Sequence, residues 1–224
     1  MSAALAIDIW SDVMCPWCVI GYKNLERALE MLEGEVAAQV RWLPFELNPD
    51  MAAEGEESTA HLARMYGRTP EQAEAGRTMM AERAREAGFP FDYTGEGEAP
   101  PAMLWNTFDA HKLLLWARET AGPKAQTRLK FALFAAHFQQ RRKVGERIVL
   151  LAIAEEAGFN PNLASAAFDD PRIAAAVRAE EQAAFDASVT GVPAMVFDGK
   201  FLVPGAQEPE TYVNLIRRVL ERRA

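Results

Sequence analysis

The sequence predicts an α/β fold in which strands from both ends of the chain flank a large all-helical block. Residues 4–10 and 36–49 are β-compatible runs, and residues 16–33 between them have helical spacing that ends at Gly34. From about residue 50 to 188 the apolar spacing is helical, and no strand is expected there. Strand patterns return afterwards, so the predicted order is β-α-β, a set of helices, and β-β-α.

The helices of the block are marked by start and stop signals. The run TPEQ at residues 69–72 is a capping box with proline at the first helical position, and Gly88 ends that helix. Further helices are expected at residues 105–122, 124–140 and 145–158, and from Asp170-Pro171 onward. Phe131, Phe134 and Phe138 recur at helical spacing, and such aromatic stripes are interpreted as core rather than as a cofactor site.

The C-terminal part of the chain returns to a strand pattern and closes with a helix. Residues 192–205 consist of an apolar run, an Asp-Gly pair and a second apolar run, which is typical of a β-hairpin. Residues 208–223 form an amphipathic pattern that is acidic at its start and basic at its end, as the helix dipole favours.

Composition narrows the possible partners. The 224 residues contain 24 Lys and Arg against 32 Asp and Glu, a net charge of −8. Nucleic acid and anionic membranes both require basic patches, so neither is expected as a partner. No run of about 20 apolar residues could span a bilayer. The N-terminus lacks the basic region of a secretory signal, so a cytoplasmic location is expected.

The only two cysteines, Cys15 and Cys18, stand three positions apart in the run SDVMCPWCVIG. A disulfide that closes so short a loop constrains the unfolded chain little, so a structural role is disfavoured. A zinc site needs four ligands, and the three histidines (His61, His111 and His137) have no paired spacing. Iron–sulfur clusters require four thiolates, and haem attachment requires histidine after the second cysteine. No metal site is therefore expected.

Redox chemistry fits the neighbours of the pair. Cys15 falls where a helix begins, so unpaired N–H groups and the helix dipole are expected to lower the pKa of its thiol. Pro16 is well placed in a first helical turn because its missing N–H would be unpaired there in any case. Cys18 lies one turn further on the same face, where it would be shielded. Met14 and Trp17 are expected to be exposed apolar groups beside the sulfur.

Taken together, the motifs resemble a known family. The segments are SDVMCPWCVIG, RWLPFELNPDM, WNTFDAHKLLLWA, TGVPAMVFDGKFLVPGAQ and the closing helix. The chain is similar to the DsbA superfamily of thioredoxin-like oxidoreductases, and in detail to its cytoplasmic FrnE-like branch. This resemblance implies a thioredoxin fold with a large all-helical insertion. The expected division is a discontinuous thioredoxin-like domain, residues 1–49 and 186–224, and a helical insertion domain, residues 50–185.

The resemblance also implies roles for individual residues. Cys15 would be the attacking cysteine, Cys18 the resolving cysteine, and Pro193 a cis-proline that faces them, preceded by Val192. Related glutathione-dependent isomerases and kappa-class glutathione transferases carry serine where Cys15 stands, so the thiol favours the dithiol branch. Some FrnE-like proteins have further cysteines near the C-terminus, and this chain has none, so no second pair can relay electrons within it.

The predicted function is that of a cytoplasmic thiol–disulfide oxidoreductase, a reductase or isomerase acting on protein or peptide disulfides. No tightly bound cofactor is expected, and glutathione is expected as a redox partner. An apolar groove formed by Met14, Pro16, Trp17 and Val192 would bind the substrate around Cys15. Two alternatives stay open: a glutathione-dependent transferase or isomerase that uses the same cleft, and a non-enzymatic helical binding module in which the cysteines are incidental.

Overall fold

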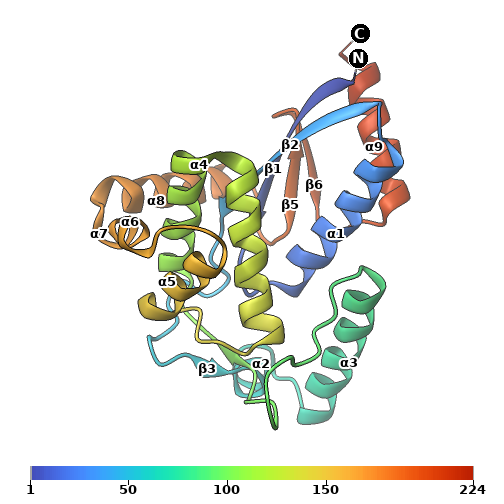
Figure 1. Ribbon diagram of the computed structural model, residues 1–224. Coiled ribbons are helices and arrows are strands. Elements are labelled where there is room, and N and C mark those ends of the chain that lie inside the picture. Colours follow the sequence, from blue (N-terminus) through green and yellow to red (C-terminus); the bar gives the residue numbers. More distant parts are fainter. Residues whose placement is uncertain (1, 224) are drawn as a thin grey trace.

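The computed structural model describes residues 2–223, so the outermost residues of the two predicted domain segments, 1 and 224, lie outside the description. Figure 1 shows the arrangement of its elements, which in chain order are β1 (Ala3–Ser11), α1 (Pro16–Met31), β2 (Val36–Pro44), β3 (Glu56–Glu57), α2 (Ser58–Tyr66), α3 (Pro70–Glu86), β4 (Met103–Leu104), α4 (Phe108–Phe134), η1 (Ala135–Gln139), α5 (Arg147–Glu156), α6 (Pro161–Ala164), α7 (Ala166–Asp169), α8 (Pro171–Asp186), β5 (Ala194–Phe197), β6 (Phe201–Pro204) and α9 (Pro209–Glu221).

The main sheet joins the two ends of the chain. Its strand order is β2-β1-β5-β6, with β1 and β2 parallel and the other two pairs antiparallel. Leu5, Ile7 and Ile9 of β1 are buried in one cluster with residues of α1 and α9, which pack side by side on that face (Figure 1). Ala4 and Ala6 point to the opposite face and are exposed. This alternation is the period-2 pattern that the sequence shows.

The helical block lies between β2 and β5 in sequence, as predicted, and its longest element is bent back on itself. Gly122 has φ +83, a left-handed conformation that glycine adopts readily, and Pro123 follows it. The two halves of α4 therefore lie side by side (Figure 1). The second half ends in η1, a short π-helical segment. The α/β class with a helical insertion is thus confirmed, whereas the division at residues 49/50 and 185/186 stays a prediction.

Two details of the strand prediction are wrong. The block contains β3 and β4, a two-residue antiparallel pair in which Glu56 is opposite Leu104. A pair this short has no periodicity to detect in the sequence. The second predicted strand, residues 36–49, ends at Pro44. Beyond it Leu47 turns away and donates its N–H to the side chain of Asp12, in the loop between β1 and α1.

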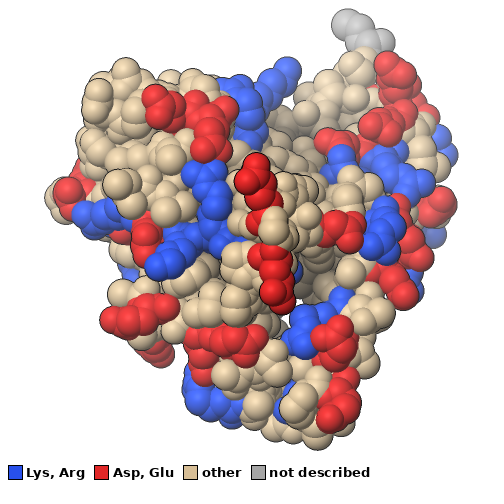
Figure 2. Space-filling view, turned by 60° about the horizontal axis from the view of Figure 1, so that its bottom comes forward, with Lys and Arg blue, Asp and Glu red and all other residues tan. Residues whose placement is uncertain are grey.

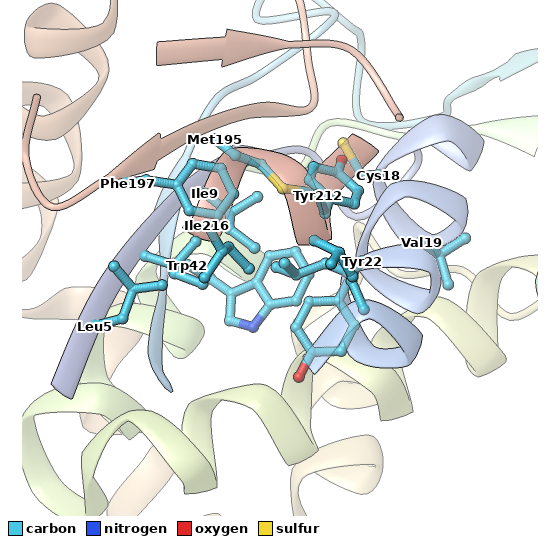
Figure 3. Close-up of a cluster of buried hydrophobic side chains, with 14 of the residues drawn as sticks. Leu5, Ile9, Cys18, Val19, Tyr22, Trp42, Met195, Phe197, Tyr212 and Ile216 are labelled. Carbon is cyan, nitrogen blue, oxygen red and sulfur yellow. The ribbon is translucent and has the colours of Figure 1, made fainter. Parts of the chain in front are cut away.

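The core beneath α1 is dense and aromatic. Figure 3 shows Tyr22 of α1 beside Trp42 of β2, and Cys18 of α1 next to Tyr212 of α9. The ring centroids of Tyr22 and Trp42 are 4.9 Å apart. Phe131, Phe134 and Phe138 pack against the same cluster, so their interpretation as core is confirmed. Both cysteines, Cys15 and Cys18, therefore belong to this buried aromatic cluster.

Candidate active site

The two thiols lie where β1 passes into α1. Cys15 is the N-cap residue of α1, with extended backbone (φ −83, ψ 111), and Pro16 begins the helix. The N–H of Cys18 donates to the carbonyl oxygen of Cys15 at 3.1 Å, which closes the first turn. Both cysteines are free thiols that form no disulfide. We call residues 12–18 the redox loop.

Asp12 holds the redox loop in shape. Its carboxylate accepts the N–H of Met14 at 3.2 Å through Oδ1 and the N–H of Leu47 at 2.7 Å through Oδ2. Its carbonyl oxygen accepts the N–H of Cys15 at 3.3 Å. Complete burial raises the pKa of Asp12, and the hydrogen bond from Leu47 opposes this rise. Asp12 therefore joins the redox loop to the segment after β2.

The segment before β5 completes the site from the other end of the chain. The Val192–Pro193 peptide bond is cis, as the resemblance implied. The thiol of Cys15 donates to the carbonyl oxygen of Val192 at 3.4 Å. Pro193 also packs closely on α1, since a Cβ at Gly21 would stand 3.2 Å from the Cγ of Pro193 and from Ala206. Residues from positions 12–21 and 192–193 therefore form one structural unit.

The site is more closed than the sequence suggests. Cys15 is 3% exposed and Cys18 is fully buried. Burial and the neighbouring Cys18 raise the pKa of Cys15 well above its usual value, against the opposing N–H of Cys18. The expected lowering of this pKa is therefore wrong for the closed dithiol form, because loss of water around the sulfur outweighs the helix N-terminus.

The expectation that Met14 is exposed beside the sulfur is also wrong. Met14 is 4% exposed and packs among residues of the helical block. Its sulfur accepts the N–H of Trp105 at 2.9 Å. Pro16, Trp17 and Val192 are half-buried, so each retains a surface that a ligand could contact. Met14 supports the redox loop from the inside.

Beside Trp17 the surface is hollow. A cavity of about 260 Å³ lies between α1, α3 and the turn before α9. Its charged and polar lining residues are Asn24, Arg27, Arg83, Glu86 and Glu208. On the face of the molecule drawn in Figure 2, acidic and basic side chains are likewise interspersed. This cavity has a mixed-charge wall and an apolar edge next to the redox loop.

Two buried titratable residues near the redox loop were not predicted as site residues. Lys130, in the second half of α4, is fully buried, and its Nζ donates to the carbonyl oxygen of Ser11 at 3.4 Å. His111, in the first half, is 2% exposed, with its Nε2 3.9 Å from Oδ1 of Asp12. The sequence does contain a signal for Lys130. It lies four residues before Phe134 and eight before Phe138, on the same helix face, so it is a charged residue in a stripe that is otherwise apolar.

Among the described residues, no cluster of three or more His, Cys, Asp and Glu is arranged to hold a metal ion. None of the described helices is both long and apolar enough to cross a membrane.

Comparison with known proteins identifies the class that this fold and site define. Residues 6–217 match the model of the DSBA-like thioredoxin domain, and the chain belongs to this family. A probable DsbA oxidoreductase from Streptomyces coelicolor, SCO1869, has a similar structure with a TM-score of 0.86 and 30% identity over 98% of this chain and 92% of that one. The Bacillus subtilis (strain 168) protein YwbO is 25% identical over 216 residues, 94% of each chain.

A more distant likeness concerns the fold alone. The cytosolic disulfide reductase DsbM from Pseudomonas aeruginosa, whose structure was determined with GSH, has a TM-score of 0.64 and 19% identity over 96% of this chain and 99% of that one. The predicted relationship to the DsbA superfamily is confirmed, and the placement in its FrnE-like branch stays a prediction.

Proposed function

We propose that the protein is a thiol–disulfide oxidoreductase that reduces or isomerises disulfides of peptides and proteins. One observation carries the proposal: two free thiols share the first turn of α1, and the Cys15 thiol faces the carbonyl oxygen of Val192 beside Pro193. In this reaction the Cys15 thiolate attacks one sulfur of the substrate disulfide. The substrate S–S bond breaks, a mixed disulfide forms, and the departing sulfur takes up a proton.

Cys18 completes the exchange. Its thiolate attacks the sulfur of Cys15, the mixed disulfide breaks, and the second substrate thiol leaves with a proton. The protein then holds a Cys15–Cys18 disulfide, and two molecules of a small thiol such as glutathione return it to the dithiol while they are oxidised to glutathione disulfide. The atoms and electrons of the cycle balance without a bound cofactor, and we propose that none is tightly bound.

The closed dithiol form favours reductase or isomerase activity over net oxidation. Strongly oxidising dithiols owe that property to a stabilised reduced form with a low thiol pKa. Here burial raises the pKa of Cys15, so the reduced pair is not stabilised as a thiolate in this way. A cytoplasmic location fits this direction, because thiols in that compartment are kept reduced.

Substrate contact is assigned to the half-buried residues at the rim of the site. Pro16, Trp17 and Val192 surround Cys15, and the 260 Å³ cavity extends the contact surface along α1. Its mixed charges suit a peptide with both amino and carboxylate groups, and glutathione has both. The structure of DsbM with GSH supports glutathione as a redox partner to be tested here.

The test uses the full chain with matched cysteine variants. With excess reduced glutathione, the wild type should reduce the interchain disulfides of insulin, and Cys15→Ser should abolish this activity. Cys18→Ser should instead accumulate a mixed disulfide with the substrate, which mass spectrometry detects, because Cys15 can still attack but nothing resolves the product. Insulin reduction by Cys15→Ser at the wild-type rate would refute the proposal. Loss of reductase activity together with retained glutathione conjugation would favour a glutathione transferase instead.

A further inference from the structure

Lys130 is a buried cation directly beneath the redox loop. Its side chain is fully buried, and its Nζ lies 5.3 Å from the centroid of the Trp42 ring and 5.0 Å from that of Phe134. Its hydrogen-bond acceptor is the carbonyl oxygen of Ser11, the residue just before Asp12. Within the described part of the chain its ammonium group thus faces rings and a carbonyl oxygen rather than a paired carboxylate.

A buried ammonium group is costly unless negative charge lies nearby. Burial lowers the pKa of Lys130 to about 8, and negative charge at Cys18, Asp12 and Cys15 acts in the opposite direction. The attraction is reciprocal for Asp12, whose pKa Lys130 lowers. By the same Coulomb attraction, a negative charge formed on either thiol would be stabilised by Lys130. Two of these three partners are the thiols of the redox pair, and both lose their capacity for charge when a disulfide forms.

We propose that Lys130 is a positioning residue for the dithiol chemistry, whose buried positive charge stabilises the thiolate forms of Cys15 and Cys18 from beneath the redox loop. The inference rests on the proposed function and names the group that makes its first step feasible. Without a cation in this closed site, the thiolate of Cys15 would be opposed by burial and by the carboxylate of Asp12 alike.

A cavity of about 10 Å³ lies beside Lys130, and this is about the size of one water molecule. Apolar residues of β2 and α4 line it together with the polar side chains of His111, Gln126 and Glu180. His111 Nε2 is buried and has no hydrogen-bond partner among the described residues, so it would bind such a water. Glu180 reaches the surface, where it pairs with Arg118. Lys130 therefore borders this small cavity and also binds the backbone just before the redox loop.

Several charged groups face this centre from the elements packed around it. They are Asp12 from the redox loop, Cys15 and Cys18 from α1, His111 from the first half of α4, and Glu180 and Arg178 from α8, with Arg178 acting on His111. Lys130 and Arg178 both lower the pKa of His111, which burial already lowers strongly. His111 is therefore neutral at pH 7, and Lys130 is the cation that acts on the thiols.

A second buried lysine provides the matched control. Lys112 is also in α4, is 4% exposed and lies 5.1 Å from the centroid of the Phe108 ring. Its Nζ donates to the carbonyl oxygen of Phe168 and pairs with Asp109. Lys112→Met therefore removes a buried lysine with aromatic and carbonyl contacts like those of Lys130 but without a role at the thiols.

The experiment measures thiol acidity and needs no disulfide substrate, so it stands even if the proposed reductase activity fails. The rate of Cys15 alkylation by iodoacetamide is followed from pH 5 to 7.5, below the pKa of about 8 at which Lys130 loses its proton, in the wild type and in Lys130→Met, Lys130→Arg and Lys112→Met. In Lys130→Met the rate at pH 7 should fall about tenfold, because a rise of one unit in the thiol pKa lowers the reactive thiolate fraction tenfold. Lys130→Arg should restore most of the rate, and Lys112→Met should match the wild type. An unchanged rate in Lys130→Met, or an equal loss in Lys112→Met, would overturn the proposal.

A second measurement covers the case in which Lys130→Met does not fold. In the wild-type protein the Lys130 ammonium group is titrated by NMR in the dithiol form and in the disulfide form. Its pKa should be lower in the disulfide form, because two of its negative partners are then absent. The same pKa in both forms would contradict a link between Lys130 and the redox pair.

Discussion

Helix α1 has two sides that differ in their exposure to water. One side carries Cys18, Tyr22 and Leu25, which are buried in the aromatic core. The other side carries Trp17 and Arg27, which line the 260 Å³ cavity. Because water is excluded from the first side, a charge there acts strongly on its neighbours, whereas charges on the second side are solvated and screened. Under the proposed function, the closed side would therefore set the thiol chemistry and the open side would bind the substrate.

The closed side holds several titratable groups whose properties burial changes. Burial raises the pKa of Cys15 and Asp12 and lowers the pKa of Lys130, His111 and His137. Each shift disfavours the charged form, so a nearby charge of opposite sign gains importance there. Substitutions on the two sides should therefore differ in kind: those on the closed side change stability or thiol acidity, and those on the open side change substrate preference.

The largest effect outside the cysteines is expected at Met14. Met14→Ser removes a buried side chain and leaves the N–H of Trp105 without its sulfur acceptor. The free energy of unfolding should fall by about 3 kcal/mol, as for other large-to-small core substitutions. Urea unfolding followed by tryptophan fluorescence measures this loss. Met79→Ser is the control, because Met79 is 46% exposed and should change stability by less than about 0.5 kcal/mol.

The opposite result at Met14 would contradict its assignment to the closed side. If Met14→Ser kept its stability but lost activity on protein disulfides, Met14 would belong to the substrate surface, as the sequence alone suggested.

The fate of Met14 indicates where sequence reasoning works and where it does not. The four strands of the main sheet, the hairpin at Asp198-Gly199 and the break at Gly122 follow from local patterns, and the structure confirms them apart from the end of the second strand. The pairing of Cys15 with Pro193 came from the resemblance, since 178 positions separate them and no local pattern connects them. Local pattern placed Met14 next to a reactive sulfur, but it could not show which neighbour would cover it.

The burial of the side chains around the redox loop could not be predicted from the sequence. Asp12 could be interpreted only as a loop or cap residue, and the cap to Met14 is present. Its second bond, to Leu47, depends on how the chain leaves β2, and that is a tertiary feature. The pKa of Cys15 was misjudged for the same reason. A helix start is visible in the sequence, whereas the loss of water around a sulfur depends on every element packed over it.

The next effect in size is the pH dependence contributed by His137. Burial lowers its pKa from 6.5 to about 3, so the folded protein keeps it neutral while the unfolded chain takes up a proton below pH 6.5. The pKa of His137 is therefore lower in the folded protein than in the unfolded chain. As the pH falls from 6.5 toward 3, only the unfolded chain gains the proton, and the folded state loses stability over that range. At pH 5 this amounts to about 2 kcal/mol relative to pH 8.

His137→Leu should remove that part of the acid sensitivity. Between pH 8 and pH 5 the wild type should lose about 2 kcal/mol more of its free energy of unfolding than the variant does. Urea unfolding of both proteins at several pH values gives the two slopes. Parallel curves for wild type and variant would mean that His137 titrates normally in the folded protein and that this part of the core is open to water.

The smallest effect, and the most selective, is expected on the open side of α1 at Trp17. Trp17 is half-buried next to Cys18 and forms the apolar edge of the cavity. Trp17→Ser removes contact surface for a bound polypeptide, which at about 1 kcal/mol corresponds to a roughly fivefold lower kcat/KM on insulin. A small reagent such as a dithiobis-nitrobenzoate contacts little beyond the sulfur, so its reaction rate should change less than about twofold.

Met31→Ser provides the matched control for this prediction, because Met31 ends the same helix and is 54% exposed, away from the cavity. It should leave both substrates unaffected. Equal losses on insulin and on the small reagent in Trp17→Ser would place Trp17 with the closed side, as a residue that tunes the thiols instead of binding polypeptide. A selective loss on insulin would instead support the division between the two sides of α1, because the attacking thiol would be intact and only the contact along the helix would be weaker.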